Sequence, residues 1–307
     1  MKIICGILSI LTVACCNIAH AEYDLDSAII NAQQQCIGFS DEFNHLKTMA
    51  GINTAVTGVG TAAGIGAAAV GFSKAEIDKK LDALSRELCG AGYCDPQTIE
   101  NMPDEEFFNK VLPTMEQMAE LVELQNKSKN LGNWRTGLMA GSAATNVAGA
   151  IIAGNNKIKT DMRAAIDDCI AAIDALQDAR MQEHISNPKT DLSAADKIIS
   201  ACGQWKYVDL SKINNRANGA MWSSVTGATL GTAGTVTSAI ANSNGVRTDA
   251  SEDGRKKEKN LNTASNVLAV GTSVASATAT VFNATQISAI KQASNVADEC
   301  EEALQNQ

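Results

Sequence analysis

The residues best able to do chemistry in this chain of 307 residues are its cysteines. Three of the nine lie in the first 21 residues, and the other six are Cys36, Cys89, Cys94, Cys169, Cys202 and Cys300. Six is an even number, and in an exported chain an even number of cysteines predicts disulfide bonds. We therefore expect all six to be oxidised, so that none acts as a nucleophile.

Four of these cysteines mark the two ends of two similar stretches of chain. We favour the bonds Cys36–Cys169 and Cys202–Cys300, because each copy of a duplicated hairpin would then carry its own bond. The rival pairing joins Cys169 to Cys202 and Cys36 to Cys300. The sequence leaves both pairings open.

Cys89 and Cys94 enclose a short glycine-rich loop that can close on itself with a disulfide. A zinc site there would need further ligands, and the only histidines after residue 21, His45 and His184, lie far away in the sequence. We also find no pattern of residues that predicts catalysis. The sequence therefore predicts a protein that is not an enzyme and that has no metal and no cofactor.

The N-terminus has the three parts of a secretory signal peptide. Lys2 is followed by an apolar run over 3–14, and the triplet Ala19-His20-Ala21 is typical of a cleavage site. We expect residues 1–21 to be removed and the protein to be periplasmic, secreted or at the cell surface. The alternative is a lipoprotein that begins at Cys15.

The charge of the chain argues against nucleic acid as a partner. The net charge is −9, and the longest basic cluster, 255–259, lies beside Glu252 and Asp253 in a polar stretch. Binding to phosphate backbones requires a basic face. We therefore expect protein or membrane partners rather than DNA or RNA.

Long helices are predicted for most of the chain. Only four prolines are present, and apolar residues recur at three- and four-residue steps over 75–88 and 161–180. Four segments have little charge and are rich in small residues, namely 48–72, 136–154, 217–241 and 261–290. Trp222 in the third of them is expected to be a packing anchor.

The chain contains signs of an internal duplication. Lys129-Asn130-Leu131 and Lys259-Asn260-Leu261 begin two similar runs, which end 40 and 41 residues after their first lysine, at Cys169 and Cys300. We predict an all-α fold, an elongated antiparallel helical bundle built from two duplicated disulfide-stapled hairpins. The first hairpin unit spans 22–185 with a helical excursion over 73–128, and the second spans 186–307.

Small residues four positions apart lie on one face of a helix, where they let two backbones approach closely. On this ground we expect close helix packing at eight positions: Gly60, Gly64, Gly137, Gly141, Gly227, Gly231, Gly271 and Ala275.

Two functions are compatible with this sequence. The first is a non-catalytic structural or interaction protein, which binds a partner or a second copy of itself through the excursion. The apolar residues of that surface are Phe107, Phe108, Val111, Met115 and Met118. The alternative is a membrane-active protein, a pore or an anchor, that inserts its small-residue segments. The segment 48–72 favours insertion, and the Ser, Thr and Asn content of the other three opposes it.

Overall fold

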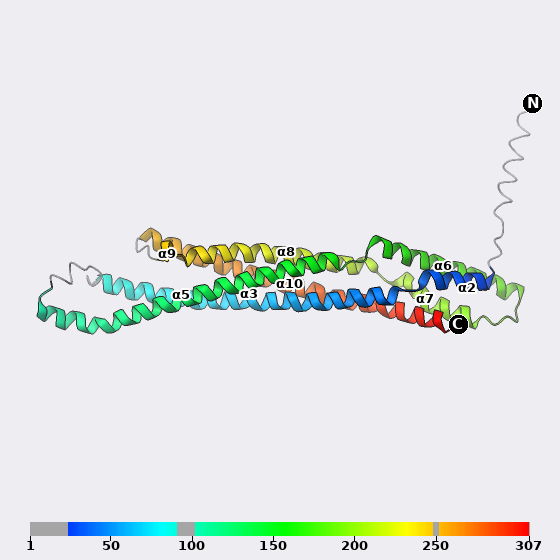
Figure 1. The fold of residues 1–307 in the computed structure, drawn as a ribbon, viewed down its shortest axis with the longest axis horizontal. Helices are drawn as coiled ribbons and strands as arrows, with labels where there is room; N and C mark the ends of the chain where they lie inside the picture. The colour runs from blue at the N-terminus through cyan, green and yellow to red at the C-terminus, as the bar shows by residue number, and fades with distance from the viewer. Residues whose placement is uncertain (1–23, 91–101, 248–251, 307) are drawn as a thin grey trace, which may run out of the picture. The chain divides into compact units, whose positions relative to one another are not determined.

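The computed structural model describes residues 24–90, 102–247 and 252–306, and every regular element in these ranges is a helix. The prediction of an all-α protein is confirmed. In chain order the elements are α2 (Leu25–Cys36), α3 (Phe39–Gly90), α5 (Asp104–Asn155), α6 (Thr160–Ser186), α7 (Ser193–Cys202), the 3-10 helix η1 (Gly203–Tyr207), α8 (Leu210–Ala241), α9 (Asn244–Arg247) and α10 (Glu252–Gln305) (Figure 1).

Local sequence explains where two of these helices stop. Gly38 separates α2 from α3 with a φ of 93°, a left-handed conformation that glycine adopts without steric cost. Pro188 follows the end of α6 and cannot continue it, because proline lacks the backbone N–H that a helix needs. The sequences of α3 and α10 contain no proline, which allows both to exceed 50 residues.

The chain forms two compact units, and each takes segments from both halves of the sequence. Unit 1 comprises residues up to Lys47, Ile158–Ile213 and Ser288–Gln307. Unit 2 comprises Thr48–Lys157 and Asn214–Ile287. This grouping differs from the expected consecutive halves 22–185 and 186–307, because α3, α8 and α10 each contribute to both units.

Unit 1 has the core of an ordinary globular domain. Its buried side chains include large apolar groups such as Ile166, Leu176 and Trp205. The Trp205 ring packs edge-on against Phe39, with centroids 5.5 Å apart, and stacks on Phe43 at 5.6 Å. Aromatic rings of this size contribute much of the apolar area that such a core buries.

A carboxylate from a distant part of the sequence caps the start of α3 in unit 1. Glu301 of α10 accepts hydrogen bonds from the backbone N–H groups of Gly38 at 2.9 Å and Ser40 at 3.0 Å. These N–H groups have no partner within their own helix, and a negative charge near a helix N-terminus is stabilising.

Replacing Glu301 with alanine is expected to lower the free energy of unfolding by about 1 kcal/mol, because both N–H groups lose their acceptor. Chemical denaturation followed by circular dichroism measures this loss. Glu302→Ala is the matched control, since Glu302 is exposed and one position further along the same helix. An equal loss in both variants would contradict the capping role of Glu301.

Two further carboxylates, Asp191 and Asp209, accept hydrogen bonds near helix starts in unit 1, and their protonation is coupled to folding. The Ser193 backbone N–H donates to Asp191 and lowers the pKa of that carboxyl, and the Ser211 hydroxyl has the same effect on the pKa of Asp209. A carboxyl whose pKa is lower in the folded state stabilises the fold above its unfolded pKa. That contribution is lost as the pH falls through the lowered value.

Unit 2 is a bundle of four helical segments, from α3, α5, α8 and α10. Contacts between α3 and α5 pair Gly60 with Ser142 and Asp78 with Ser128, so the residue numbers run in opposite directions and the two helices are antiparallel. The remaining neighbours, α5 with α8, α8 with α10 and α10 with α3, are antiparallel by the same test.

Besides these four antiparallel pairs, α5 and α10 form a fifth pair in unit 2, and this pair is parallel. Asn146 of α5 bonds Ser276 of α10, and Arg135 of α5 bonds Asn266 of α10, so both numbers fall together. Because every pair of neighbours keeps a constant register, residues on different helices can be assigned to the same level of the bundle. An up-down-up-down bundle has this arrangement.

Candidate functional site

Both disulfides of the described residues lie in unit 1. Cys36 is bonded to Cys169, and Cys202 is bonded to Cys300, with Cα–Cα distances of 4.8 and 4.5 Å. These are the two bonds that the spacing of the sequence favours. The sulfur atoms of Cys36, Cys169 and Cys300 lie within 4.8 Å of one another, so the two bonds form one layer. Oxidised sulfur does not provide the thiolate that a metal ion requires.

Removing the Cys36–Cys169 bond with a double alanine variant is expected to lower the free energy of unfolding by about 2–4 kcal/mol. The bond spans a sequence separation of 133 residues, and its loss returns conformational freedom to the unfolded chain. Denaturant unfolding in oxidising buffer measures the difference. In reductant the variant and the unchanged protein should become nearly equal, and equal stability in oxidising buffer would contradict the prediction.

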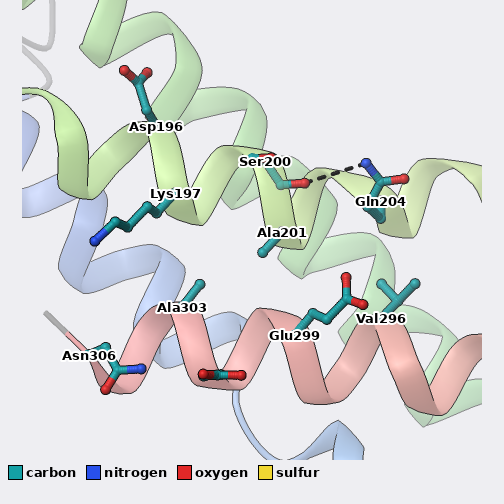
Figure 2. A pocket seen from close by; sticks show the side chains of 10 residues that line it. Asp196, Lys197, Ser200, Ala201, Gln204, Val296, Glu299, Ala303 and Asn306 are labelled. Carbon is teal, nitrogen blue, oxygen red and sulfur yellow. Dashed lines mark hydrogen bonds between the residues drawn. The ribbon is translucent and has the colours of Figure 1, made fainter.

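A groove of unit 1 lies between α7, η1 and the end of α10, and its volume is about 820 Å³. Side chains from the segment 196–204 and from α10 line its two walls, and Asp196 points away from α10 (Figure 2). The walls carry three carboxylates, Asp196, Glu299 and Glu302, and one lysine, Lys197. Asp196 is already held by Arg180 at 2.9 Å. The groove is open and polar, unlike the concave apolar pockets that bind small molecules.

Unit 2 has a polar interior. All but one of the buried polar side chains in the described residues belong to it, whereas its buried apolar residues are mostly alanine. The polar interior consists of Asn53, Thr57, Lys74, Ser128, Arg135, Ser142, Asn146, Asn156, Ser224, Ser238, Asn262, Ser265, Asn266, Thr272, Ser276, Asn283 and Gln286.

Hydrogen bonds between helices satisfy much of this interior. The Asn53 amide donates to Asn283 at 2.9 Å, and Asn146 bonds the Ser276 hydroxyl at 2.7 Å. The Ser142 hydroxyl donates to the backbone carbonyl of Gly60 at 2.7 Å. Small residues allow these helices to approach closely enough for short polar side chains to reach across.

Charged side chains are also buried inside unit 2. Lys74 lies 2.6 Å from Asp78 and 3.6 Å from Glu258. Asp78 also accepts hydrogen bonds from Ser128 at 2.6 Å and Asn262 at 3.2 Å. A buried charge is tolerated only when it is paired and hydrogen-bonded, and the lysine here meets both conditions.

Arg135 continues this network with three hydrogen bonds. Its Nε donates to Ser238 at 3.0 Å, and its two terminal nitrogens donate to Asn266 at 3.1 Å and Asn262 at 2.7 Å. The guanidinium therefore joins α5 to α8 and α10, and Asn262 links it to Asp78 of α3. One buried network thus contacts all four helices of unit 2.

The outer surface of unit 2 is apolar. All but five of the large exposed apolar side chains in the described residues belong to this unit. We name its aliphatic members between the two ends of the bundle the apolar belt: Ile52, Val59 and Ile65 of α3, Val147 and Ile151 of α5, Val225, Val236 and Ile240 of α8, and Val267, Val270, Val274 and Val281 of α10. A surface with many large exposed apolar side chains marks an interaction with another protein or with a membrane.

Three helical stretches are long and apolar enough to cross a membrane: Leu25–Leu88, Thr114–Ser186 and Glu252–Gln305. In the most apolar 18-residue window of each, 33% of the residues are buried. α8 is not among the stretches found in the described ranges.

Most of the predicted close-packing residues lie where two helices meet. A Cβ built on Gly60 would lie 2.6 Å from Thr145, and one on Gly64 or Gly231 would lie 3.2 Å from the backbone Cα of a neighbouring helix. A Cβ on Gly227 would lie 2.8 Å from Asn146, and one on Gly271 would lie 3.1 Å from Leu230. Ala275 is buried.

Gly137 and Gly141 are in a different position from the other six. Both are exposed, and a Cβ added to either would meet no atom within 4 Å. The contacts of α5 are made instead by Gly132 and Gly149, where an added Cβ would lie 2.1 Å from Asn242 and 2.8 Å from Thr57. The four-residue spacing identifies one face of the helix, but the opposite face is the one that packs.

Part of the predicted partner surface falls outside the described residues. Cys94 and the side chains of Cys89, Phe107, Phe108 and Val111 lie there. Met115 is exposed and Met118 is half-buried on α5. Trp222, expected to be a packing anchor, is 64% exposed on α8.

The polar interior is not among the predictions from the sequence, although Asn53, Asn146 and Asn283 lie in segments made mostly of small residues and are a visible signal for it. Comparisons of the chain with protein-family models, with curated proteins and with solved structures gave no match.

Proposed function

We propose that unit 2 inserts into a lipid bilayer as a helical bundle and anchors the disulfide-bonded unit 1 there. The observation that carries this proposal is the inverted burial in unit 2. Water-soluble domains place large apolar side chains inside, as unit 1 does. Unit 2 buries Asn, Ser and charged residues and exposes Ile and Val instead. In a bilayer, Ile and Val face the lipid at little cost, and polar residues turn toward the interior of the bundle, where they bond between helices.

The lengths of the uncharged segments support insertion. Residues 48–73, 136–156, 217–246 and 260–290 contain no Asp, Glu, Lys or Arg. Each has at least 21 residues, which is about 32 Å of helix at a rise of about 1.5 Å per residue. The hydrocarbon core of a bilayer is about 30 Å thick. The constant register of unit 2 places the four segments side by side at the same level.

The many hydroxyl groups, which oppose insertion on sequence alone, are compatible with lipid in this structure. Exposed threonines of α8 donate to the carbonyl four residues earlier, as Thr226 does to Trp222 at 3.0 Å and Thr229 does to Val225 at 2.9 Å. Thr278 of α10 does the same with Val274 at 2.8 Å. A hydroxyl satisfied within its own helix leaves no unpaired donor facing lipid.

The test is flotation of the purified chain from Glu22 onward with lipid vesicles. We expect the protein to float and to stay bound through carbonate and high-salt washes. Recovery at the bottom of the gradient, in both the oxidised and the reduced protein, would refute insertion. Flotation only after reduction would instead show that the disulfide layer restrains the bundle.

A second candidate is the exported structural or interaction protein, in which the apolar belt packs against another protein or a second copy of this chain. The same exposed Ile and Val residues favour it, since apolar belts are also found at protein interfaces. Sizing with light scattering in detergent-free buffer separates the candidates. A discrete oligomer that does not float supports this one.

Two finer proposals concern the origin of the bundle and its export. The antiparallel pairs α3/α5 and α8/α10 support a duplicated hairpin, because each is bracketed by one disulfide.

The two disulfides also support export to an oxidising compartment after loss of residues 1–21. N-terminal sequencing of the protein from its native compartment should begin at Glu22, and a blocked or lipidated Cys15 would contradict this.

A further inference from the structure

Exposed aromatic side chains mark one end of the apolar belt. A Cβ on Gly71 of α3 would lie 3.2 Å from the Arg135 side chain of α5, so these two positions share a level. Their sequence neighbours are Phe72, 60% exposed, and Trp134, 68% exposed. Two large exposed aromatic rings thus lie at the same level of the bundle, and this level is that of Arg135 in the buried charged network.

A third exposed aromatic residue marks the other end. Trp222 of α8 lies two residues from Ser224, and the Ser224 hydroxyl and Asn53 are each 3.2 Å from a Cβ built on Gly149. On α8 the residue at the level of Arg135 is Ser238, because the two side chains are hydrogen-bonded. Sixteen residues separate Trp222 from Ser238, which is about 24 Å of helix. This separation approaches the hydrocarbon thickness of about 30 Å.

Basic residues flank every uncharged segment of unit 2. The first charged residue on each side is basic in all cases, namely Lys47, Lys74, Arg135, Lys157, Arg216, Arg247, Lys259 and Lys291. The chain has more acidic residues, 34, than basic ones, 25, so this pattern does not follow from composition. Lysine and arginine at the ends of apolar helices extend their charges to the lipid phosphates.

We propose that unit 2 spans the bilayer, with Phe72 and Trp134 at one interface and Trp222 at the other. The exposed lysines that flank its uncharged segments, Lys47, Lys259 and Lys291, bind anionic phospholipid headgroups, whereas Lys74 and Arg135 belong to the buried network. This inference rests on the proposed insertion and adds orientation and lipid class to it. Tryptophan and tyrosine concentrate at membrane interfaces because their rings are apolar and carry one polar N–H or O–H. A bundle lying flat on the surface would place both tryptophans on the same side.

The orientation test uses Trp134→Phe and Trp222→Phe in the full protein, added to preformed vesicles that contain an anionic phospholipid. Each variant keeps one exposed tryptophan, and Trp205, 2% exposed in unit 1, is a shielded background in both. In one sample, a membrane-impermeant spin label is added only outside the vesicles. In a second sample, the label is present on both sides, because it is also enclosed inside the vesicles. We expect external label to quench one of the two tryptophans fully and the other by half or less of its two-sided value.

Equal quenching of both tryptophans by external label would overturn the spanning orientation while leaving insertion intact. Flotation of each variant is measured first, so a failure of insertion itself is recognised separately. Brominated lipids give a second readout, because each tryptophan should be quenched more strongly by bromine near the headgroup than by bromine at the bilayer centre.

The lipid class is tested with Lys259→Gln and Lys291→Gln, two exposed flanking residues. Each substitution should weaken binding to anionic vesicles by about fivefold, since a basic residue near such a surface contributes that much attraction. Binding to neutral phosphatidylcholine vesicles should be unchanged. Lys189→Gln, an exposed lysine of unit 1, is the control. Equal binding of the unchanged protein to anionic and neutral vesicles would overturn the headgroup assignment.

Discussion

Arginine in place of Ile65 or Val274 is expected to reduce binding of the protein to vesicles by roughly a hundredfold or more. Both side chains are about 60% exposed in the apolar belt, between the levels of Trp222 and Trp134. They follow Gly64 and Ser273, where a Cβ built on Gly64 would lie 3.2 Å from the Ser273 backbone. An arginine near the centre of a membrane helix costs about 2.5–3.5 kcal/mol, and the lost aliphatic side chain adds to that cost.

The control for this prediction is Ile185→Arg. Ile185 is 80% exposed in unit 1, which we expect to remain in water, so its substitution should leave vesicle binding unchanged. In detergent-free buffer the belt variants should unfold within about 0.5 kcal/mol of the unchanged protein, because exposed substitutions rarely affect stability. Vesicle binding that survives both belt substitutions would contradict the proposed lipid-facing surface.

Replacement of Arg135 by methionine is expected to lower the free energy of unfolding by about 3–5 kcal/mol. The substitution leaves Asn262, Asn266 and Ser238 without their donor. It also removes a positive charge close to the half-buried carboxylate of Asp78. Removing one member of a buried charged network has an effect of this size, because the remaining groups stay desolvated.

Two further variants interpret the Arg135 result. Arg135→Lys keeps the charge but not the planar fork of donors, so we expect an intermediate loss of stability. Arg163→Met is the control, since Arg163 is exposed in unit 1 and its loss should change stability by less than about 0.5 kcal/mol. Thermal unfolding by circular dichroism measures all three. A loss at Arg135 no larger than at Arg163 would show that the network contributes little.

The helical class and the favoured disulfide bonds could be predicted from the sequence because each depends on local or countable features. Rare prolines and apolar residues at helical steps predict long helices. Cysteines at matching distances along two similar runs favour the bonds Cys36–Cys169 and Cys202–Cys300 over the rival pairing without excluding it, and the favoured bonds are present. These inferences needed no knowledge of which helix face packs inward.

The face that packs inward could not be predicted for the helices of unit 2. Glycine, alanine, serine and threonine occur on all sides of these helices, so the contrast between an apolar and a polar face is weak. On α5 the spacing singled out Gly137 and Gly141, whereas the contacts are made through Gly132 and Gly149. The inward face depends on where two backbones can approach, and that is a property of the assembled helices.

The inverted burial also escaped the sequence analysis. The sequence shows how many Ser, Thr and Asn residues a segment contains, but not whether their side chains face the bundle interior or the outside. Asn53 and Asn146 point into the bundle, and exposed threonines such as Thr226 bond their own helix. The signal for a membrane that the sequence does contain is the basic residue at each end of every uncharged segment. This pattern can be recognised from the sequence because it does not require knowledge of which helix face packs inward.

The disulfide layer has a topological consequence for the whole chain. Each bond closes a separate covalent ring, one over residues 36–169 and one over 202–300, and neither ring contains a cysteine of the other. A single peptide-bond cleavage within either ring opens it without releasing a fragment. A nicked molecule therefore keeps its full mass until it is reduced. The helices of each ring can also move from water into another environment while the disulfide keeps the two ends of the ring joined.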